Sequence, residues 1–471
     1  MNGIEADLCV IGAGAAGLGV AAGAAQMGAR TVLVERDRMG GDCLHTGCVP
    51  SKALLAAAAR AATAGDAGRF GIDAGPVRVD FDRVRAHVRR TIDAIAPHDS
   101  EARFSGLGVT VLRADARFTG PAEVHAGDTV VRARRFVVAT GSTPSVPDVP
   151  GLGQVPYLTN ETVFDQPALP GHLVVMGGGP VGIEMAQAHR RLGSRVTLLE
   201  RDRILARDDP ELVAVVRDRL TAEGVTIREG VHISAATAVD GQVVVALADG
   251  GTPVTGSHLL VATGRQPTVS GLGLDAAGIV FTPAGITVDR HMRTSNRRVF
   301  ALGDVVGGWQ FTHMAGYQAG IVLRNALFRW PARLDGRAVP RVTYCDPELA
   351  AVGLSEAEAR RSGAAVRVLR ASFADNDRAR AEGRPEGLVK VVTGRRGRIL
   401  GAAIAGAHAG ELIQPWVLAI GRGLGIGAMA AMVAPYPTLG EASRRAAGDW
   451  FAPTLFGPRV RRIVRLLGRL G

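Results

Sequence analysis

A unit of sequence that occurs twice limits the folds open to this chain more than any other feature. In the first copy, Gly12-Ala-Gly-Ala-Ala-Gly17 follows a short apolar strand and opens an alanine-rich helix, and a second apolar strand ends in Glu35. The second copy has Gly177-Gly-Gly-Pro-Val-Gly182 in the same context and ends in Glu200. In both copies 23 residues separate the first glycine from the acid, from 12 to 35 and from 177 to 200. Two such fingerprints predict two dinucleotide-binding sites.

The residue types in each copy suit a dinucleotide for physical reasons. The first glycine permits a tight turn, the second lets the backbone approach a pyrophosphate, and the third lets the helix pack closely on the strand. The helix then directs its first amides at the phosphates. A carboxylate can accept both ribose hydroxyls but repels a 2′-phosphate, so Glu35 and Glu200 favour ligands without one. Arg201 and Arg207 could pair with a phosphate, yet NADH over NADPH is the prediction.

The rest of the chain predicts further elements. Each copy is followed by an apolar run that reads Val-Ala-Thr-Gly, at Val138–Gly141 and Val261–Gly264, and both runs are expected to be strands. A strand over 298–305 is expected to place Asp304 at a glycine turn. From Arg341 the pattern changes, and the expected elements are strands at 342–352 and 387–392 and helices at 355–362 and 411–424. Because no third glycine fingerprint occurs there, we expect a separate α+β domain.

The positive net charge of the chain first suggests a nucleic-acid partner, but the distribution of its basic residues does not support one. Its 471 residues include 55 basic and 44 acidic side chains, a formal net charge of +11. All but two of the basic residues are arginines spread along the whole chain, and aromatic residues are only 4%, too few for a base-stacking surface. We therefore expect no nucleic-acid partner. In a chain that uses arginine so uniformly, Lys52 and Lys390 are expected where arginine would not serve.

Hydrophobicity and cysteine usage indicate a globular protein without a structural disulfide framework. Hydrophobic residues make up 47% of the chain, which supports buried cores, and four cysteines are too few for a disulfide framework. The segment 1–7 lacks a basic region, so a signal peptide is not expected and the predicted location is cytoplasmic. The uncharged run 8–29 could span a bilayer by length, but its glycines favour a buried strand, a turn and a helix.

A pair of cysteines carries the clearest chemistry. Cys43 and Cys48 lie five residues apart and precede an alanine-rich helix predicted over 53–64. Such a pair can form a small-loop disulfide, and a helix N-terminus favours a thiolate at its mouth. The alternatives are two ordinary thiols or half of a zinc site. Zinc needs a second pair of ligands, and neither Cys9 nor Cys345 has a Cys or His at matching spacing. We expect a redox pair and no resident metal.

Together these motifs resemble the FAD-dependent pyridine nucleotide–disulfide oxidoreductases of class I, the family of dihydrolipoamide dehydrogenase, glutathione reductase and mercuric reductase. The resemblance covers essentially the whole chain, including Ala301–Asp304 and Asp346-Pro-Glu. It implies an α/β fold with two Rossmann-like dinucleotide-binding domains, for FAD and NAD(P), plus a C-terminal α+β dimerisation domain. The implied division is an FAD domain over 1–148, an NAD(P) domain over 149–270, a returning central part of the FAD domain over 271–338, and a dimer-interface domain over 339–471.

The resemblance also implies roles for individual residues. The residues implied to hold FAD are Gly12, Gly14, Gly17, Glu35, Lys52, Ala116, Thr140, Gly141, Asp304 and Thr312. Those implied to line the NAD(P)H site are Gly177, Gly179, Gly182, Glu200 and Gly264. Glu184 is implied to lie beside Lys52 near the flavin ring, where an ammonium can tune hydride transfer. Electrons would pass from NAD(P)H through FAD to a Cys43–Cys48 disulfide, with Cys48 as the thiolate next to the flavin and Cys43 facing the acceptor.

One departure from the family pattern bears on the acceptor. Disulfide reductases of this family carry His-Pro-Thr-x-x-Glu near the C-terminus, whereas this chain has Tyr436-Pro-Thr-Leu-Gly-Glu441. A tyrosine titrates near ~10 and is a poor general base at neutral pH, and Glu441 then has no imidazole to orient. Tyrosine here resembles mercuric reductase, but 466–471 lacks the vicinal cysteine pair of those enzymes.

Three functions follow as hypotheses. The first is a mercuric-reductase-like oxidoreductase, acting on a metal ion or on a small or protein-bound disulfide. The second is a dihydrolipoamide dehydrogenase or small-disulfide reductase with tyrosine in place of histidine. The third is an electron-transfer flavoprotein at a membrane surface.

The last residues motivate the membrane alternative. Over 458–471 one helical face would carry Val460, Ile463, Val464, Leu467 and Leu470, and arginines lie toward the other face. Arg459–Gly471 could contact an anionic membrane or pack on the homodimer that the resemblance implies, and packing is favoured.

Overall fold

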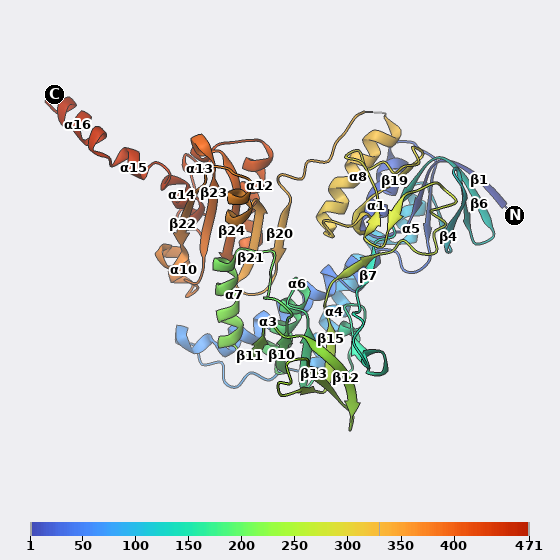
Figure 1. Ribbon diagram of the computed structural model, residues 1–471, viewed down its shortest axis with the longest axis horizontal. Helices are drawn as coiled ribbons and strands as arrows, with labels where there is room; N and C mark the ends of the chain where they lie inside the picture. Colours follow the sequence, from blue (N-terminus) through green and yellow to red (C-terminus); the bar gives the residue numbers. More distant parts are fainter. Residues whose placement is uncertain (1, 329, 470–471) are drawn as a thin grey trace. The chain divides into compact units, whose positions relative to one another are not determined.

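The computed structural model describes residues 2–328 and 330–469 (Figure 1). Leu470 and Gly471, which the tail prediction included, lie outside the described residues. The chain forms two compact units: the first comprises 1–171, 234–246 and 253–335, and the second comprises 172–233, 247–252 and 336–471. The predicted α/β class is confirmed, with parallel sheets and a separate C-terminal sheet. The four-part division into domains stays a prediction.

The first unit is built on a seven-stranded sheet. Its order is β3-β2-β1-β6-β5-β4, and β19 also pairs with β6. Strands β3, β2, β1, β6 and β19 pair in parallel, whereas β4 and β5 join antiparallel. These strands are β1 (Asn2–Ile11), β2 (Thr31–Glu35), β3 (Val109–Arg113), β4 (Ala116–Gly120), β5 (Glu123–Ala126), β6 (Thr129–Val138) and β19 (Val299–Ala301).

Helices and short ribbons complete the first unit. Its helices are α1 (Ala15–Gln26), α2 (Gly41–His45), α3 (Cys48–Gly65), α4 (Phe81–Ile95), α5 (Glu101–Gly106) and α8 (Thr312–Leu327). The remaining strands that lie wholly or mostly in it are β7 (Ser142–Pro144), β8 (Tyr157–Leu158), β12 (Ile233–Val239), β13 (Gln242–Leu247), β14 (Val254–Gly256), β15 (His258–Val261), β16 (Arg265–Pro267), β17 (Phe281–Thr282) and β18 (Gly285–Ile286).

Alternation along β1 explains why this sheet is covered on both faces. Leu8 and Val10 belong to the apolar cluster that includes residues of α1 and α8, whereas Cys9 and Ile11 belong to the cluster on the opposite face. Burial raises the pKa of the Cys9 thiol to about 12, so it behaves as a core residue. The uncharged run 8–29 is a strand, a turn and the helix α1, as predicted. No helix in 2–328 or 330–469 is long and apolar enough to cross a membrane.

The second unit contains two sheets. Strands β9 (His172–Met176), β10 (Arg195–Leu199) and β11 (Val225–Arg228) pair in parallel. The C-terminal sheet is antiparallel, in the order β20-β21-β24-β23-β22. Its strands are β20 (Pro340–Thr343), β21 (Glu348–Gly353), β22 (Arg367–Ser372), β23 (Leu388–Thr393) and β24 (Ile399–Gly406).

Helices cover the C-terminal sheet around the buried Trp416. The helices of the second unit are α6 (Pro180–Leu192), α7 (Pro210–Ala222), α9 (Glu356–Arg361), α10 (Asp377–Ala381), α11 (Ala409–Leu412), α12 (Gln414–Gly421), α13 (Ile426–Ala430), α14 (Glu441–Gly448), α15 (Ala452–Leu455) and α16 (Pro458–Leu467). Helix α9 agrees with the prediction over 355–362, and Ser355 and Glu358 form a capping box at its start.

Several predicted boundaries were wrong. The runs Val138–Gly141 and Val261–Gly264 are not strands throughout, because β6 and β15 end at the valines and the glycines have positive φ. The strand over 298–305 is only β19, and Asp304 lies in a short 3-10 turn. The single strand expected over 342–352 is the hairpin β20–β21, whose turn contains Pro347, a residue that cannot donate to a strand ladder.

Two predicted helices also differ from those in the structure. Helix α3 begins at Cys48, not at residue 53, so the second cysteine is its first residue. The helix expected over 411–424 is the pair α11 and α12, which meet at Ile413 just before Pro415.

Candidate functional site

The first glycine loop is shaped by close backbone contacts that only glycine allows. Gly12 has a φ of +100°, and a Cβ there would lie 2.4 Å from the carbonyl oxygen of Ala139. A Cβ on Gly17 would lie 1.8 Å from the carbonyl oxygen of Gly12, so glycine keeps α1 against β1. By contrast, a Cβ on Gly14 would meet nothing within 4 Å. The open space above the start of α1 fits the pyrophosphate of FAD.

The acid at the end of β2 is held by the same loop. Glu35 Oε2 accepts a hydrogen bond of 2.6 Å from the Ala13 amide, and Oε1 accepts one of 2.8 Å from the Asp37 amide. Each carboxylate oxygen keeps a second lone pair that can accept a ribose hydroxyl. Among the described residues, no side chain caps α1, so its first amides are available to a phosphate.

The second glycine loop repeats this geometry in the second unit. Gly177 has a φ of +111°. A Cβ on Gly182 would lie 1.9 Å from the Gly177 carbonyl oxygen, whereas Gly179 borders open space. Glu200 Oε2 accepts 2.6 Å from the Gly178 amide, and Oε1 accepts 2.9 Å from the Asp202 amide. The duplication read from the sequence is therefore a duplication of backbone geometry as well, and the second loop fits a second dinucleotide.

The two cysteines lie at the junction of α2 and α3, in the first unit. The cysteines of the chain are free thiols in this structure, and Cys48 Sγ lies 3.2 Å from the hydroxyl of Thr312, at the start of α8. A hydrogen bond from Cys43, the Thr312 hydroxyl and the charge of Lys52 together lower the pKa of Cys48 to about 6. The same bond to Cys48 and burial raise the pKa of Cys43. At neutral pH the pair therefore holds one proton on Cys43 and a thiolate at Cys48.

A polar network lies beside the pair. The Asp42 carboxylate accepts 2.9 Å from Asn160 Nδ2 and pairs with Arg265 at 3.1 Å. Asp304 accepts 2.6 Å from the Ser142 hydroxyl and lies 3.7 Å from Arg265, and burial raises its pKa.

The sequence analysis missed Asn160, Arg265 and Ser142. The only local signal was the position of Arg265 directly after the glycine of the second Val-Ala-Thr-Gly run. The carboxylate partners lie 118 residues away for Asn160, 162 for Ser142, and 223 and 39 for Arg265.

Three other residues proposed for FAD lie in or just after strands of the seven-stranded sheet: Ala116, Thr140 and Gly141. Thr140 donates 2.8 Å to the carbonyl of Thr268, and Gly141 follows with a φ of +68°. Ala116 is buried at the start of β4, where it pairs with Ala126. Gly264, which was predicted for the NAD(P)H site, follows β15 in the first unit and has a φ of +139°.

The remaining predicted residues belong to the second unit. Glu184 lies in α6, is buried, and accepts 3.0 Å from the amide of Tyr344. Tyr436 is 71% exposed, and its hydroxyl donates 2.9 Å to Asp377, which raises the pKa of the phenol. Glu441 begins α14. Among the predicted residues, the structure groups those of each glycine loop and the set Cys43, Cys48, Lys52 and Thr312.

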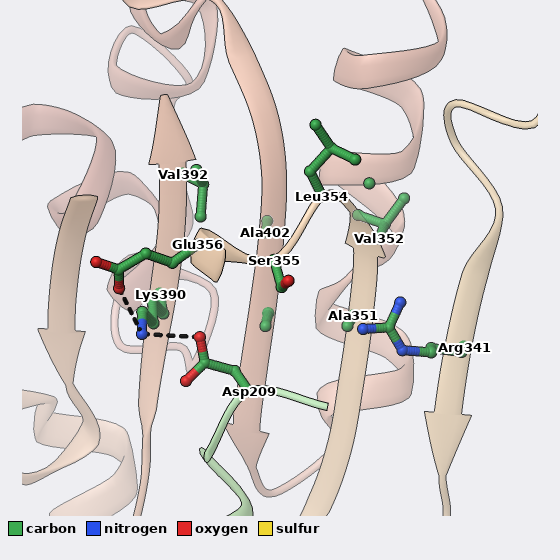
Figure 2. Close-up of a pocket in the computed structure, with 12 residues that line it drawn as sticks. Asp209, Arg341, Ala351, Val352, Leu354, Ser355, Glu356, Lys390, Val392 and Ala402 are labelled. Atoms are coloured by element: carbon green, nitrogen blue, oxygen red, sulfur yellow. Dashed lines mark ion pairs between the residues drawn. The ribbon is translucent and has the colours of Figure 1, made fainter. Parts of the chain in front are cut away.

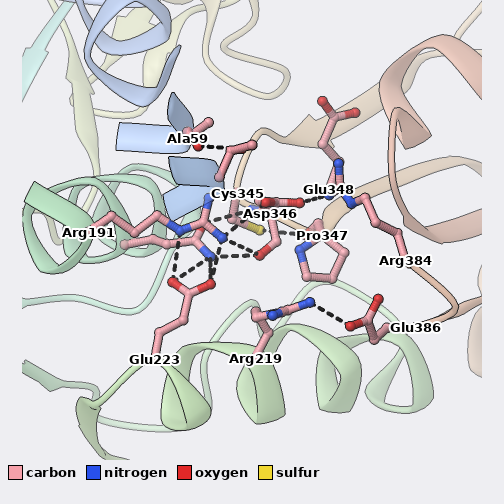
Figure 3. Close-up of polar contacts among 12 residues, drawn as sticks. Ala59, Arg191, Arg219, Glu223, Cys345, Asp346, Pro347, Glu348, Arg384 and Glu386 are labelled. Carbon is pink, nitrogen blue, oxygen red and sulfur yellow. Dashed lines mark hydrogen bonds and ion pairs between the residues drawn. The ribbon is translucent and has the colours of Figure 1, made fainter. Parts of the chain in front are cut away.

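The Asp346-Pro-Glu motif anchors an ion network inside the second unit, shown in Figure 3. Arg191, nearly buried, binds both carboxylate oxygens of Glu223 and lies 3.0 Å from Asp346. Arg384 also pairs with Asp346. The motif therefore serves to fix α6 to the turn before β21.

Two loops built for dinucleotides and a thiolate pair define a nucleotide-dependent redox protein, and comparisons with known proteins agree. Residues 6–319 match the family profile described as pyridine nucleotide-disulphide oxidoreductase, and residues 339–447 match the dimerisation domain of that family. Mercuric reductase of Streptomyces lividans is 37% identical over 94% of this chain and 95% of its own length. Dihydrolipoyl dehydrogenase of Thermus scotoductus is 36% identical over 94% of this chain and 96% of its own.

Solved structures show the same relationship. LpdA from Mycobacterium tuberculosis superposes with a TM-score of 0.87 at 27% identity, covering 94% of this chain and 99% of that one. The Cu(II) complex of the HOCl-induced flavoprotein disulfide reductase RclA from Escherichia coli has a TM-score of 0.84 at 27% identity, covering 93% and 98%.

This chain belongs to the pyridine nucleotide–disulfide oxidoreductases. It is thus a flavoprotein disulfide oxidoreductase of an FAD-dependent family that uses pyridine nucleotides, and its dimerisation domain supports a homodimer.

Proposed function

We propose that this enzyme passes electrons from NADH, through FAD, to the Cys43–Cys48 pair and on to a soft metal ion such as Hg(II). The observation that carries the proposal is the Cys48 thiolate, which a thiol, a hydroxyl and an ammonium stabilise together. Thiolates are the ligands that soft ions prefer, and mercuric reductases are prominent among the relatives of this chain.

The residues around the first loop would hold FAD, which supplies a hydride acceptor when bound. Gly12, Gly14 and Gly17 leave space for the pyrophosphate, and Glu35 would accept the ribose hydroxyls. Lys52 would lie near the flavin, and Asp304 would bind a polar edge of the cofactor from its turn. Gly177, Gly179, Gly182 and Glu200 would form the NADH site in the second unit. Glu200 favours NADH because its carboxylate repels a 2′-phosphate.

The cysteine pair binds the acceptor after its own disulfide has been reduced. Two electrons break the Cys43–Cys48 disulfide and leave a thiol and a thiolate, with one proton taken up by Cys43. Hg(II) then binds the two sulfurs and displaces that proton. A second pair of electrons reduces Hg(II) to Hg(0), which leaves the sulfurs.

Reduction of lipoamide or another small disulfide is the second candidate, favoured by the identity with dihydrolipoyl dehydrogenase. That reaction needs a group that returns a proton to the leaving thiolate. Tyr436 is poorly suited to cycle that proton, because its bond to Asp377 raises the pKa of a phenol that is already a weak acid. Glu441 would orient an imidazole that this chain lacks. We therefore rank metal-ion reduction first.

The test is NADH oxidation by the FAD-loaded enzyme with Hg(II), Cu(II), lipoamide or glutathione disulfide as acceptor. We expect turnover with Hg(II) and a loss of at least about 100-fold in Cys43→Ser and Cys48→Ser, because each removes a reacting sulfur. Cys345→Ala, which removes a buried thiol in the second unit, is the control and should keep its activity. Lipoamide turnover with a higher kcat/KM than Hg(II) would overturn this ranking in favour of the second candidate.

A further inference from the structure

The second unit carries a helix in which no residue is buried. Helix α16 follows α15, and in Figure 1 it extends beyond the helices that cover the C-terminal sheet of this unit. Every residue from Pro458 to Leu467 is at least partly exposed, and Ile463, Val464 and Leu467 are each more than half exposed. The dimerisation domain of the family ends at residue 447, so this helix lies outside the matched region.

The side chains of α16 are sorted onto two opposite faces. Successive residues of a helix turn by about 100°, so side chains can be placed around its axis. One arc of about 100° then contains only apolar residues: Val460, Ile463, Val464 and Leu467. The opposite arc of about the same width contains three cations, Arg461, Arg462 and Arg465, and otherwise only Pro458 at the start of the helix. A helix with one apolar and one cationic face suits a boundary between a hydrocarbon phase and anionic groups.

Charge and aromatic side chains point to the same kind of boundary. Residues 450–469 contain five arginines and no acidic residue, a net charge of +5. Just before α16, Phe451, Leu455 and Phe456 are exposed. A protein partner would be expected to meet the apolar stripe, but it would leave the arginines on the other face of α16 without a function. Anionic lipid headgroups complement those cations directly.

We propose that the segment 450–469 docks this enzyme on the surface of an anionic lipid bilayer. The apolar stripe lies at the boundary of the acyl chains, and the arginines contact the lipid phosphates. The phenylalanines before α16 add apolar contacts at the same depth. The inference concerns only where the enzyme binds, so it is independent of the electron acceptor.

Sedimentation with vesicles tests this docking on the FAD-loaded full chain. We expect binding to vesicles that contain phosphatidylglycerol, weaker binding as salt is added, and little binding to pure phosphatidylcholine. Arg462→Gln/Arg465→Gln should weaken partitioning roughly 30-fold, the factor expected for two arginines near an anionic surface. Ile463→Asn/Leu467→Asn should weaken it as well, because it interrupts the apolar stripe.

The matched control is Arg297→Gln/Arg298→Gln, which removes the same charge from an exposed loop of the first unit. It should bind vesicles as well as the unchanged protein, and NADH-dependent turnover in the absence of vesicles should be equal in all variants. Absence of binding to phosphatidylglycerol vesicles would overturn the proposal, as would an equal loss in the control. If deletion of 458–471 weakens the dimer and the intact protein ignores vesicles, the helix packs on a second copy instead.

Discussion

Lys390 is one of two lysines in the chain, and its contacts indicate why a lysine occupies this position. Its Nζ lies 2.8 Å from Asp209, 2.8 Å from Glu211 and 2.9 Å from Glu356, and its side chain is only 5% exposed. Figure 2 shows two of these carboxylates, Asp209 just before α7 and Glu356 in α9, paired with Lys390 in β23. An ammonium is a compact charge with three donors, whereas a planar guanidinium could not satisfy three such directions in this space. These contacts agree with the expectation that lysine marks a place where arginine would not serve, and Lys390→Arg tests it.

Replacing Lys390 by methionine should destabilise the protein by about 3 kcal/mol, because Asp209, Glu211 and Glu356 would lose the cation that they share. Lys390→Arg should cost less, since it keeps the charge but not the fit. Arg370 and then Lys390 lower the pKa of Glu211 to about 2, and Lys390 also lowers the pKa of Glu356.

These lowered pKa values determine how the stabilisation of the fold by Lys390 depends on pH. Folded-state values below the unfolded ones mean that the stabilisation is present above about pH 4.5 and is lost as the pH falls toward 2. Denaturant unfolding at several pH values measures this. A difference between Lys390→Met and the unchanged protein that stays constant down to pH 3 would contradict it.

The Cys48 thiolate gives a second prediction at this scale. In the reduced enzyme, the rate of Cys48 alkylation by iodoacetamide should rise with pH around a pKa of about 6. Cys43→Ala should raise this pKa most, because the bond from Cys43 is the largest cause of its lowering, and Thr312→Val should raise it less. Each variant should therefore react more slowly at pH 6 and approach the unchanged rate above pH 9. Equal profiles for all three proteins would show that these contacts do not stabilise the thiolate.

Among the elements, the two glycine loops were predictable almost to the residue, whereas the ends of β6 and β15 were not. The loops obey a local steric rule, since Gly12 and Gly17 meet backbone atoms that any side chain would displace. The end of β6 depends instead on a contact across the sheet, where Gly12 packs against Ala139. Alanine and threonine are compatible with a strand, so nothing in the local sequence marked the stop.

Because Gly14 and Gly17 have different surroundings, substituting them should have different effects, one on flavin binding and the other on stability. Gly14→Val should leave the thermal unfolding of the FAD-free protein nearly unchanged, because its side chain enters open space, but it should lower flavin content by obstructing the pyrophosphate. Gly17→Ala should destabilise the FAD-free protein by about 2 kcal/mol or more, because its Cβ overlaps the Gly12 carbonyl. Flavin absorbance per chain and unfolding of the FAD-free form separate the two. Full flavin content in Gly14→Val would remove the assignment of this loop to FAD.

At the scale of the whole molecule, the motifs in the sequence were sufficient to predict the class of protein. They were not sufficient to predict the contacts that tune its chemistry. The cysteine pair and Lys52 were predictable from spacing. The partners of Asp42 and Asp304 were not, because Asn160, Ser142 and Arg265 reach them only after folding. The acceptor is likewise undetermined by fold, since mercuric reductases and dihydrolipoyl dehydrogenases are similar to this chain to nearly the same degree.

The proposed homodimer makes one further prediction. If Tyr436 of one protomer serves the cysteine pair of its partner, heterodimers of Cys48→Ser and Tyr436→Ala chains contain one site in which both residues are intact. Co-expression with two affinity tags isolates this heterodimer, and its NADH-dependent turnover should reach about half that of the unchanged dimer, with one of two sites working. Turnover no higher than that of the two parent homodimers would show that Tyr436 does not serve the partner's cysteine pair.

The scarcity of lysine also gives the molecule a built-in reporter. A protease specific for lysine has only two positions to cut, one in α3 beside the thiol pair and one in β23, where Lys390 is enclosed by acids. Cleavage at either position requires the local backbone to leave its helix or sheet. Two fragment patterns on a gel would therefore report separately on the opening of the first unit and of the C-terminal sheet, without any label attached.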